Sequence, residues 1–493
     1  MELLDVPRLT KALNQACHRV IGDNFSYASD EEAVAATLAL LETRLLHGRE
    51  VFDRWTGHLD TYLAGLKSRL SLDTIAPDLA EGLDQLRREI AAADPRGKAE
   101  LDEVERHLLK AWGLLSARLN GDDRLPQEER DRMAVELAEA EMRRTEERMG
   151  KNVLERNGDD NDITAESLAA YLVDRFADQT ITVSAFKRLP GGYGKETTLF
   201  TVEGERFSGD YVMRRDRDTP TIDNDCHRIS NETPVIEAAF AKGFPAPEAM
   251  WCDTEHRLLP GGDFLIMKRA PGATGGDVFG SAGKVSDDLT RLLADSVGKL
   301  HSLPQMRELG DLTSGIRKEL WDMSCKEVTI HYITSFRDLY LAEMDEPTPA
   351  VLGLYGYLLN DVPDAPGEPK LLHGDIGFHN FIVDEGNLSA VVDWEFAHIG
   401  DPADDIGYIA NTVGGSLDWD RFMALYKQAG GQDIDSEQLR FFRIWGHLRN
   451  LTACQLSTNA YETGRLHDIK IAHVGHSMTP MFLNAIRSVF ARP

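Results

Sequence analysis

Two short polar clusters, each joined to an apolar run, constrain the fold of this chain more than any other part of its sequence. The first cluster, 373–380, precedes the run 381–383, and the run 388–392 ends directly before Asp393. A turn-forming tetrad separates the two runs. This pattern predicts a β-hairpin. A hairpin would bring Asn380, at the start of one strand, beside Asp393, at the end of the other.

The two clusters contain the side chains that phosphoryl transfer from a nucleotide requires. One carboxylate must orient the attacking hydroxyl, and a second carboxylate with an amide oxygen must hold Mg²⁺ on the phosphates. Mg²⁺ is a hard ion that prefers oxygen ligands, so Asp and Asn suit it. Asp375, Asn380 and Asp393 supply this set. Asp and Asn are also common in turns, but H-G-D, an Asn, a hairpin and D-W-E in this order are far more specific.

Both clusters resemble motifs of one enzyme group. HGDIGFHN (373–380) is similar to the catalytic loop H-x-D-x-x-x-x-N of the aminoglycoside phosphotransferase and choline kinase group. DWEFAHIGDPADDIGYI (393–409) resembles that group's metal-binding segment and the helix after it. The resemblance extends from about residue 163 to the C-terminus. It implies an α+β, bilobal protein-kinase-like fold with an antiparallel β N-lobe and a helical C-lobe, here preceded by an all-α N-terminal region.

The resemblance also implies roles for individual residues. Asp375 would be the catalytic base, and Asn380 and Asp393 would bind Mg²⁺. The residues that would brace the loop are His373 and either Asp401 or Asp405. ATP would be the phosphoryl donor, and a small molecule would carry the accepting hydroxyl. A protein substrate is disfavoured, because the helix-like segment follows Asp393 too closely to leave room for a peptide-docking activation loop.

A Gly-rich turn and an arginine are the expected phosphate ligands. Gly191, Gly192 and Gly194 lie between two strand-like segments, where a turn lets backbone N–H groups approach phosphate oxygens closely. Arg214 stands where the kinase pattern has a lysine, and arginine can bind two oxygens at once. Arg215 is the poorer candidate, because side chains alternate along a strand. A plain hairpin turn and a basic surface strand are the simpler alternatives.

The resemblance places two further nucleotide-binding elements downstream. Glu232 on the next helix would pair with Arg214, and Glu237 is the fallback. The following apolar strand and its exit resemble the hinge between lobes, where backbone groups would bind adenine and a methionine would line the base pocket. The hinge residues are Met267, Arg269 and Ala270.

A chain of 493 residues is long enough for two or three domains. We expect a helical N-terminal domain over 1–156, a kinase-like N-lobe over 163–270, and a C-lobe with the catalytic loop and acceptor-binding helices over 271–493. Apolar residues recur every three or four positions through the first of these, with a helix break expected at Gly48. These N-terminal helices are candidates for a homodimer contact or for a cover over the kinase module.

Composition excludes several classes of partner. The net charge of −28 disfavours nucleic acid and anionic membranes. The five cysteines are scattered and include no C-x-x-C, so neither a zinc site nor a disulfide framework is indicated, which suits a reducing cytoplasm. The start of the chain lacks a signal-peptide pattern, and the longest apolar run, 33–41, is too short to span a bilayer. We therefore expect a cytoplasmic enzyme.

The acceptor is the least constrained part of this interpretation. The helix-like segment 438–454 carries arginines, a histidine and aromatic residues, whereas aminoglycoside enzymes use acidic residues to hold their polycationic drugs. This favours a small alcohol, a phenol or another aromatic metabolite, although a solvated helix face would look the same. Resemblance to kinase-like domains fused to some acyl-CoA dehydrogenases makes hydroxyacyl-CoA an alternative acceptor. A nucleotide-binding pseudokinase scaffold is a further alternative, which the arginine at position 214 mildly favours.

Overall fold

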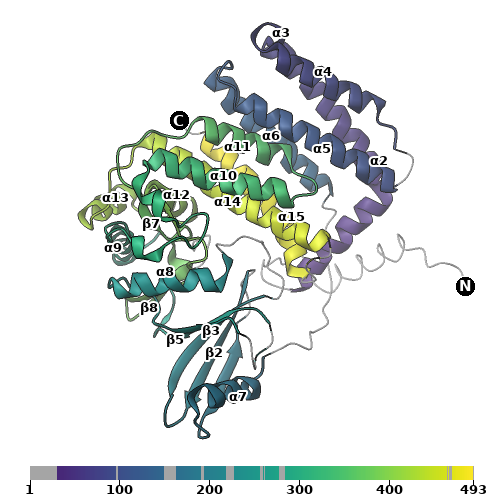
Figure 1. Ribbon diagram of the computed structural model, residues 1–493. Coiled ribbons are helices and arrows are strands. Elements are labelled where there is room, and N and C mark those ends of the chain that lie inside the picture. The colour runs from purple at the N-terminus through teal and green to yellow at the C-terminus, as the bar shows by residue number, and fades with distance from the viewer. Residues whose placement is uncertain are drawn as a thin grey trace, which may run out of the picture. The chain divides into compact units, whose positions relative to one another are not determined.

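The structure is a computed structural model, and it groups the chain into two compact units (Figure 1). The residues that it describes are 30–95, 98–148, 163–189, 194–217, 227–255, 259, 261–276, 284–463, 465 and 469–491. The helical unit comprises the described residues of Met1–Asn157, Ile333–Val362 and His447–Pro493. The mixed unit comprises those of Gly158–Tyr332 and Pro363–Gly446. Two segments of the predicted C-lobe thus pack with the N-terminal helices, and the domain boundaries themselves remain a prediction.

The helical unit confirms the predicted all-α character of the N-terminal region. Pro77 begins one of its helices, where the missing N–H of proline costs nothing. No helix in the described ranges is both long and apolar enough to cross a membrane. The unit is built from α2 (Asp30–Arg69), α3 (Leu72–Ile75), α4 (Pro77–Ala92), α5 (Lys98–Asn120), α6 (Gln127–Arg148), α11 (Pro349–Asn360), α15 (Ile469–Phe490) and parts of α10 (Cys325–Glu343) and α14 (Ser436–Glu462).

Helix α2 corrects one boundary. The expected break at Gly48 is wrong, because α2 runs without interruption from Asp30 to Arg69. A glycine inside a helix costs about 1 kcal/mol relative to alanine, which weakens a helix without ending it. A Cβ at Gly48 would lie 3.4 Å from the Leu101 side chain of α5, so the glycine sits where the neighbouring helix packs closely. Tertiary packing therefore outweighs the local propensity.

The mixed unit begins with an antiparallel sheet, which confirms the predicted N-lobe architecture. Thr164 caps the first helix, and its side chain accepts a hydrogen bond from the Ser167 backbone N–H, as an N-cap residue does. The five strands lie in the order β1-β2-β3-β5-β4, all neighbours antiparallel. The elements of this part are α7 (Ala165–Phe176), β1 (Thr182–Arg188), β2 (Lys195–Glu203), β3 (Gly209–Asp216), α8 (Ile229–Ala241), β4 (Ala249–Asp253) and β5 (Phe264–Lys268).

The rest of the mixed unit is mostly helical and carries the loops of interest. A core of apolar side chains joins α8 to the helices and the hairpin of this part, with Phe244 packed edge-on against Trp394 at 5.6 Å. The elements are β6 (Ala273–Thr274), α9 (Asp287–His301), η2 (Arg307–Leu309), η3 (Lys318–Asp322), β7 (Lys370–Leu372), η4 (Phe378–Asn380), β8 (Phe381–Asp384), β9 (Asn387–Val391), β10 (His398–Gly400), α12 (Ala403–Thr412) and α13 (Trp419–Gln428).

The predicted hairpin is present as β8 and β9. Phe381 pairs with Val391, and Asp384 pairs with Asn387 across a tight turn. Both turn residues, Glu385 and Gly386, have positive φ, as the favoured two-residue hairpin turns require. The register holds the polar cluster before β8 and the one after β9 at the same end of the hairpin.

Candidate active site

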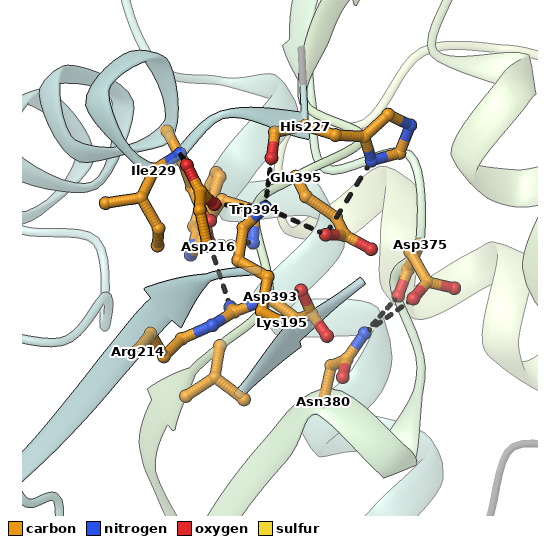
Figure 2. A network of polar contacts seen from close by, with 12 residues as sticks. Lys195, Arg214, Asp216, His227, Ile229, Asp375, Asn380, Asp393, Trp394 and Glu395 are labelled. Atoms are coloured by element: carbon orange, nitrogen blue, oxygen red, sulfur yellow. Dashed lines mark hydrogen bonds and ion pairs between the residues drawn. The ribbon is translucent and has the colours of Figure 1, made fainter. Parts of the chain in front are cut away.

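The catalytic-loop residues converge at the entrance to β8. The Asn380 side-chain amide donates hydrogen bonds to the backbone oxygen and Oδ2 of Asp375, at 2.8 and 3.0 Å (Figure 2). His379 Nε2 lies 3.3 Å from the other carboxylate oxygen of Asp375. Burial would raise the pKa of Asp375, but His379, a hydrogen bond with Tyr408 and His373 outweigh it and hold the pKa below its usual range. Asp375 is therefore an ionised, pre-oriented hydrogen-bond acceptor at neutral pH.

Asp393 is held beside Asn380 by the hairpin ladder. The Val392 N–H, one residue before Asp393, donates to the Asn380 backbone oxygen at 2.9 Å. Asp393 has φ +69°, a left-handed conformation that Asp and Asn tolerate better than most residues. This turn away from the strand keeps the Asp393 side chain about one-third exposed. The backbone therefore turns away from the strand at Asp393 and leaves the carboxylate accessible beside Asn380.

The side-chain oxygens of Asn380 and Asp393 fit a hard divalent cation. The Asn380 amide nitrogen is used toward Asp375, which leaves its Oδ1 as the free acceptor. Asp393 uses Oδ1 toward Arg214 and keeps Oδ2. One amide and one carboxylate oxygen are ligands that Mg²⁺ accepts, with water and phosphate completing its shell. Among the described residues, no group of three or more His, Cys, Asp or Glu side chains is placed to hold a metal.

Arg214 links the sheet to the hairpin. Its Nη1 donates to Glu232 Oε1 at 2.9 Å, and its Nη2 donates to Asp393 Oδ1 at 2.6 Å. Figure 2 labels Arg214 and Asp393. Burial lowers the pKa of Arg214, but Asp393 and Glu232 more than compensate and raise it, so the guanidinium stays charged. Glu232 is buried and also accepts the Trp394 backbone N–H at 3.0 Å, whereas Glu237 is exposed. The structure therefore places Glu232, and not the second candidate Glu237, beside Arg214.

Lys195 is a second cation at this site, and the sequence reasoning assigned it no role. Its ammonium lies 3.3 Å from Asp216 and 3.4 Å from Glu395, and it also donates to the His227 backbone oxygen (Figure 2). Burial lowers the pKa of Lys195, but Glu395, Glu232 and Asp216 outweigh it and raise the pKa. Two sequence features could have indicated this role. Lys195 directly follows the Gly-rich turn, and D-W-E supplies Glu395 as a carboxylate partner. Two buried cations therefore sit where one was expected.

The loop is braced by a buried carboxylate, as the resemblance implied. Asp405 accepts the backbone N–H groups of His373 and Gly374, at 3.1 and 2.8 Å. It also accepts His301 Nε2 at 3.1 Å, and His301 Nδ1 lies 2.8 Å from the Tyr426 hydroxyl. Burial alone would raise the pKa of Asp405, but His301 and the backbone donors lower it. Asp405 faces the loop, whereas Asp401 binds the Gln438 side chain at 2.9 Å.

Gly374 occupies a position in the catalytic loop that only glycine fits without strain. It adopts φ +79°, and a Cβ there would lie 2.3 Å from the Phe396 carbonyl oxygen, a backbone atom. We expect Gly374→Ala to destabilise the protein by about 1–3 kcal/mol and to lower turnover by displacing the catalytic loop. Chemical denaturation and steady-state kinetics would measure both.

Gly386 provides the matched control for this substitution. It has φ +83° in the hairpin turn, but a Cβ there would meet nothing within 4 Å. Gly386→Ala should cost only about 1 kcal/mol of strain and leave turnover unchanged. Equal stability losses for the two variants would contradict the importance of the Phe396 contact.

His373 predicts a pH dependence of stability. Its Nε2–H donates to the Val392 carbonyl at 3.0 Å and its Nδ1 accepts the Asp375 N–H at 3.3 Å, an arrangement that suits the neutral ring. Burial lowers the pKa of His373 and outweighs Asp405, Asp375 and Asp393. The unfolded chain protonates His373 near pH 6.5, whereas the folded chain resists protonation. This contribution is present above about pH 6.5 and is lost as the pH falls, at up to about 1.4 kcal/mol per pH unit.

Urea unfolding at several pH values between 7.5 and 5.5 would measure this slope. We expect His373→Gln to reduce the slope, whatever its effect on absolute stability. The same slope in both proteins would exclude His373 as the titrating group.

The structure describes some of the other residues that were predicted to bind the nucleotide. Gly191 and Gly192 lie outside the described residues. A Cβ at Gly194 would lie 3.2 Å from Glu395 Oε2, so the end of the turn approaches the Lys195 cluster. Met267 is buried in β5, and the Arg269 N–H donates to the Asp210 carbonyl, which removes it as an adenine donor. The Arg269 carbonyl and the backbone of Ala270 remain as the predicted hinge groups, and their binding to adenine stays a prediction.

One expectation about the acceptor is wrong. The aromatic residues of the segment 438–454 were candidates for the acceptor pocket, but Phe441, Phe442 and Trp445 are buried in the protein interior. The Trp445 indole donates to Asp404 at 3.0 Å. Arg443 is half-buried and donates to Asn411 of α12 at 3.1 Å. The aromatic residues of this segment therefore pack the core, because the helix is buried on most of its surface.

Comparison with known proteins identifies relatives of this chain. The model of the "Phosphotransferase enzyme family" matches residues 185–442, slightly more than half of the chain. Acyl-CoA dehydrogenase family member 11 from Gallus gallus is 26% identical over 248 residues, covering 49% of this chain and 30% of that protein. The Homo sapiens protein of the same name is 24% identical over 256 residues, covering 50% of this chain and 30% of its own length. The chain thus spans about a third of the length of these relatives.

Solved structures show weaker likeness. A putative aminoglycoside phosphotransferase from Ralstonia eutropha has a TM-score of 0.47 and 17% identity, covering 67% of this chain and 99% of its own. Aminoglycoside phosphotransferase APH(4)-Ia, in a ternary complex with AMP-PNP and hygromycin B, has a TM-score of 0.45 and 18% identity, with 67% and 100% covered.

Proposed function

The chain belongs to the phosphotransferase enzyme family, and on that premise we propose that it transfers the γ-phosphoryl group of ATP to a hydroxyl of a small molecule in a Mg²⁺-dependent reaction. The observation that carries the proposal is the convergence of Asp375, Asn380 and Asp393 at one end of the hairpin, with Arg214 bound to Asp393. A divalent cation bound by the side-chain oxygens of Asn380 and Asp393 would neutralise charge on the phosphates.

Side chains of the protein orient the acceptor hydroxyl and supply the positive charge near the phosphates. Asp375 accepts the hydrogen bond, and then the proton, of the attacking hydroxyl, with its carboxylate held by Asn380 and His379. Arg214 and Lys195 place two positive charges near the phosphates. The transition state of phosphoryl transfer is loose, so orientation and fixed charge supply most of the rate enhancement. A carboxylate with a depressed pKa therefore suffices, since its main task is orientation.

A small alcohol, phenol or other aromatic metabolite, and not an aminoglycoside, is the proposed acceptor. The side chains that meet near Asp375 are His379 and Tyr408, whose rings lie 6.5 Å apart, and Arg443 lies beside Asn411 on the same helix as Tyr408. Histidine, phenol and guanidinium groups suit a neutral or anionic acceptor. A polycationic drug would instead need carboxylates at these positions.

Hydroxyacyl-CoA is a second candidate acceptor, favoured by one observation. The relatives that match half of this chain carry the name acyl-CoA dehydrogenase family member 11. An acyl-CoA thioester with a free hydroxyl would be a substrate of that chemical class. It would use the same catalytic groups and differ only in what binds beyond Asp375.

One experiment tests the function and separates the acceptors. The protein is incubated with ATP, Mg²⁺ and a pool of small hydroxyl compounds that includes 3-hydroxyacyl-CoA, and mass spectrometry detects any compound that gains a phosphoryl group. Asp375→Asn, treated identically, is the control. A phosphorylated alcohol or phenol supports the first acceptor, and a phosphorylated thioester supports the second. ATP binding without any product in a broad pool would favour a nucleotide-binding scaffold.

A further inference from the structure

The helical unit contains a cavity that the proposed phosphotransfer does not use. It has a volume of about 240 Å³ and is lined by residues of α2, α5, α6 and the start of α11. These helices lie side by side in the helical unit (Figure 1). An apolar cavity of about 150 Å³ is known to hold benzene in another protein. The space therefore suits a single ring with a short substituent.

Aromatic side chains form the walls of this cavity. Trp55 and Tyr62 of α2 and Trp112 of α5 line it, together with Leu137 of α6. Tyr62 and Trp112 pack edge-on, with ring centroids 6.0 Å apart. Rigid aromatic walls favour a planar ligand, because offset-stacked and edge-on contacts with a ring add to the area buried.

Each acidic residue of the lining is already paired with an arginine, and Arg144 is shared between Glu141 and Glu105. Three glutamates line the cavity, which by itself would favour a cation over the aromatic faces. Each of them, however, binds an arginine of the same unit. The pairs are Glu136–Arg69 at 2.7 Å, Glu139–Arg487 at 3.3 Å and Glu141–Arg144 at 2.9 Å. A cationic ligand would have to compete with one of these arginines for a carboxylate.

Arg143 is a cation of the lining that has no partner among the described residues. It lines the cavity, its side chain is exposed, and it forms no ion pair or hydrogen bond within the part of the chain that the structure describes. The Tyr62 phenol also faces the cavity. Burial, with the charge of Glu136, raises its pKa, so it stays a neutral donor. The lining therefore offers the Arg143 guanidinium, the exposed His58 ring and the Tyr62 hydroxyl beside its aromatic walls.

We propose that this cavity is a second small-molecule site, which binds a small aromatic carboxylate with its ring between Trp55, Trp112 and Leu137 and its carboxylate on Arg143. A charge-assisted contact between guanidinium and carboxylate fixes the orientation of the ligand. The aromatic walls supply most of the contact area. Apart from Pro349 and Ala350 of α11, the lining lies outside the residues that the phosphotransferase family model matches. None of the lining residues is among those proposed to carry out the phosphoryl transfer.

Phenylacetate and phenethylamine are the matched probes, since they share a ring and differ in the sign of their charge. Titration of the full chain, followed by tryptophan fluorescence and calorimetry, should show saturable binding of phenylacetate and at least about tenfold weaker binding of phenethylamine. Arg143→Glu should weaken phenylacetate binding at least about tenfold. Ala140→Trp, at an exposed lining position, should block the cavity and abolish binding. Saturating ATP with Mg²⁺ should leave the affinity unchanged.

Several results would overturn the proposal. These are equal or tighter binding of phenethylamine, unchanged binding by Arg143→Glu or Ala140→Trp, competition with ATP, or no saturable binding of phenylacetate at millimolar concentration. Far-UV circular dichroism and thermal unfolding check that both variants fold. If Ala140→Trp does not fold, the exposed Arg143→Glu variant still decides the outcome.

Discussion

Asp375→Asn should lower the turnover number by about 10²–10⁴-fold, the usual contribution of a positioned general base, and leave ATP affinity nearly unchanged. The side chains that bind the Asp375 carboxylate are His379 and the proposed metal ligand Asn380, and not the proposed phosphate ligands Arg214 and Lys195. The new amide can turn its oxygen to the Asn380 amide and its nitrogen to His379, so the loop can keep its geometry. Product formation and nucleotide binding, measured separately, check this expectation.

Asp384→Asn is the matched control for that substitution. Asp384 is exposed at the other end of β8, where it pairs with Asn387 across the turn. The same chemical change there should leave turnover at the wild-type level. A joint loss of turnover and ATP binding in Asp375→Asn would remove Asp375 from the role of base.

Asp393→Asn should raise the Mg²⁺ concentration needed for half-maximal activity by at least about 100-fold. Loss of a residue that only supports a metal ligand already costs about 10–100-fold in metal affinity, and Asp393 is proposed as a ligand itself. Asparagine keeps the shape of the side chain and tolerates the φ of +69°. The substitution therefore removes a charge without straining the backbone.

The same substitution leaves Arg214 with Glu232 as its remaining carboxylate partner at the site. Because a buried cation that loses a partner is destabilising, thermal unfolding should accompany the Mg²⁺ titration. A folded Asp393→Asn protein with wild-type Mg²⁺ dependence would end the assignment of Asp393 as a metal ligand.

The resemblance that the motifs carry is confirmed at the level of family, since the phosphotransferase model matches residues 185–442. Local signals were reliable where they depended on neighbours in sequence. The hairpin is one case, because two turn residues that adopt positive φ separate two apolar runs. The break at Gly48 failed because packing against α5 outweighed a local penalty of about 1 kcal/mol.

The family resemblance indicated the pairing of Arg214 with Glu232, which the structure shows, but no local pattern indicated the other pairings between distant charges. Lys195 and Glu395 are far apart along the chain, yet their charged groups lie 3.4 Å from each other. Phe441 and Trp445 were expected to line the acceptor pocket, but both are buried in the core. The sequence does not distinguish these two cases, because a helix with arginines and aromatic residues has the same pattern whether its rings face a pocket or the core.

The sequence by itself determined the local elements of the candidate site, which are the loop with Asp375 and Asn380 and the hairpin that leads to Asp393. These follow from side-chain types and turn propensities within a few residues of one another. Only the tertiary structure decided which carboxylate each cation meets, which aromatic side chains are buried, and that Ile333–Val362 and His447–Pro493 pack with the N-terminal helices. The physical reason is that burial and charge pairing depend on distances in space between residues that the chain order does not relate.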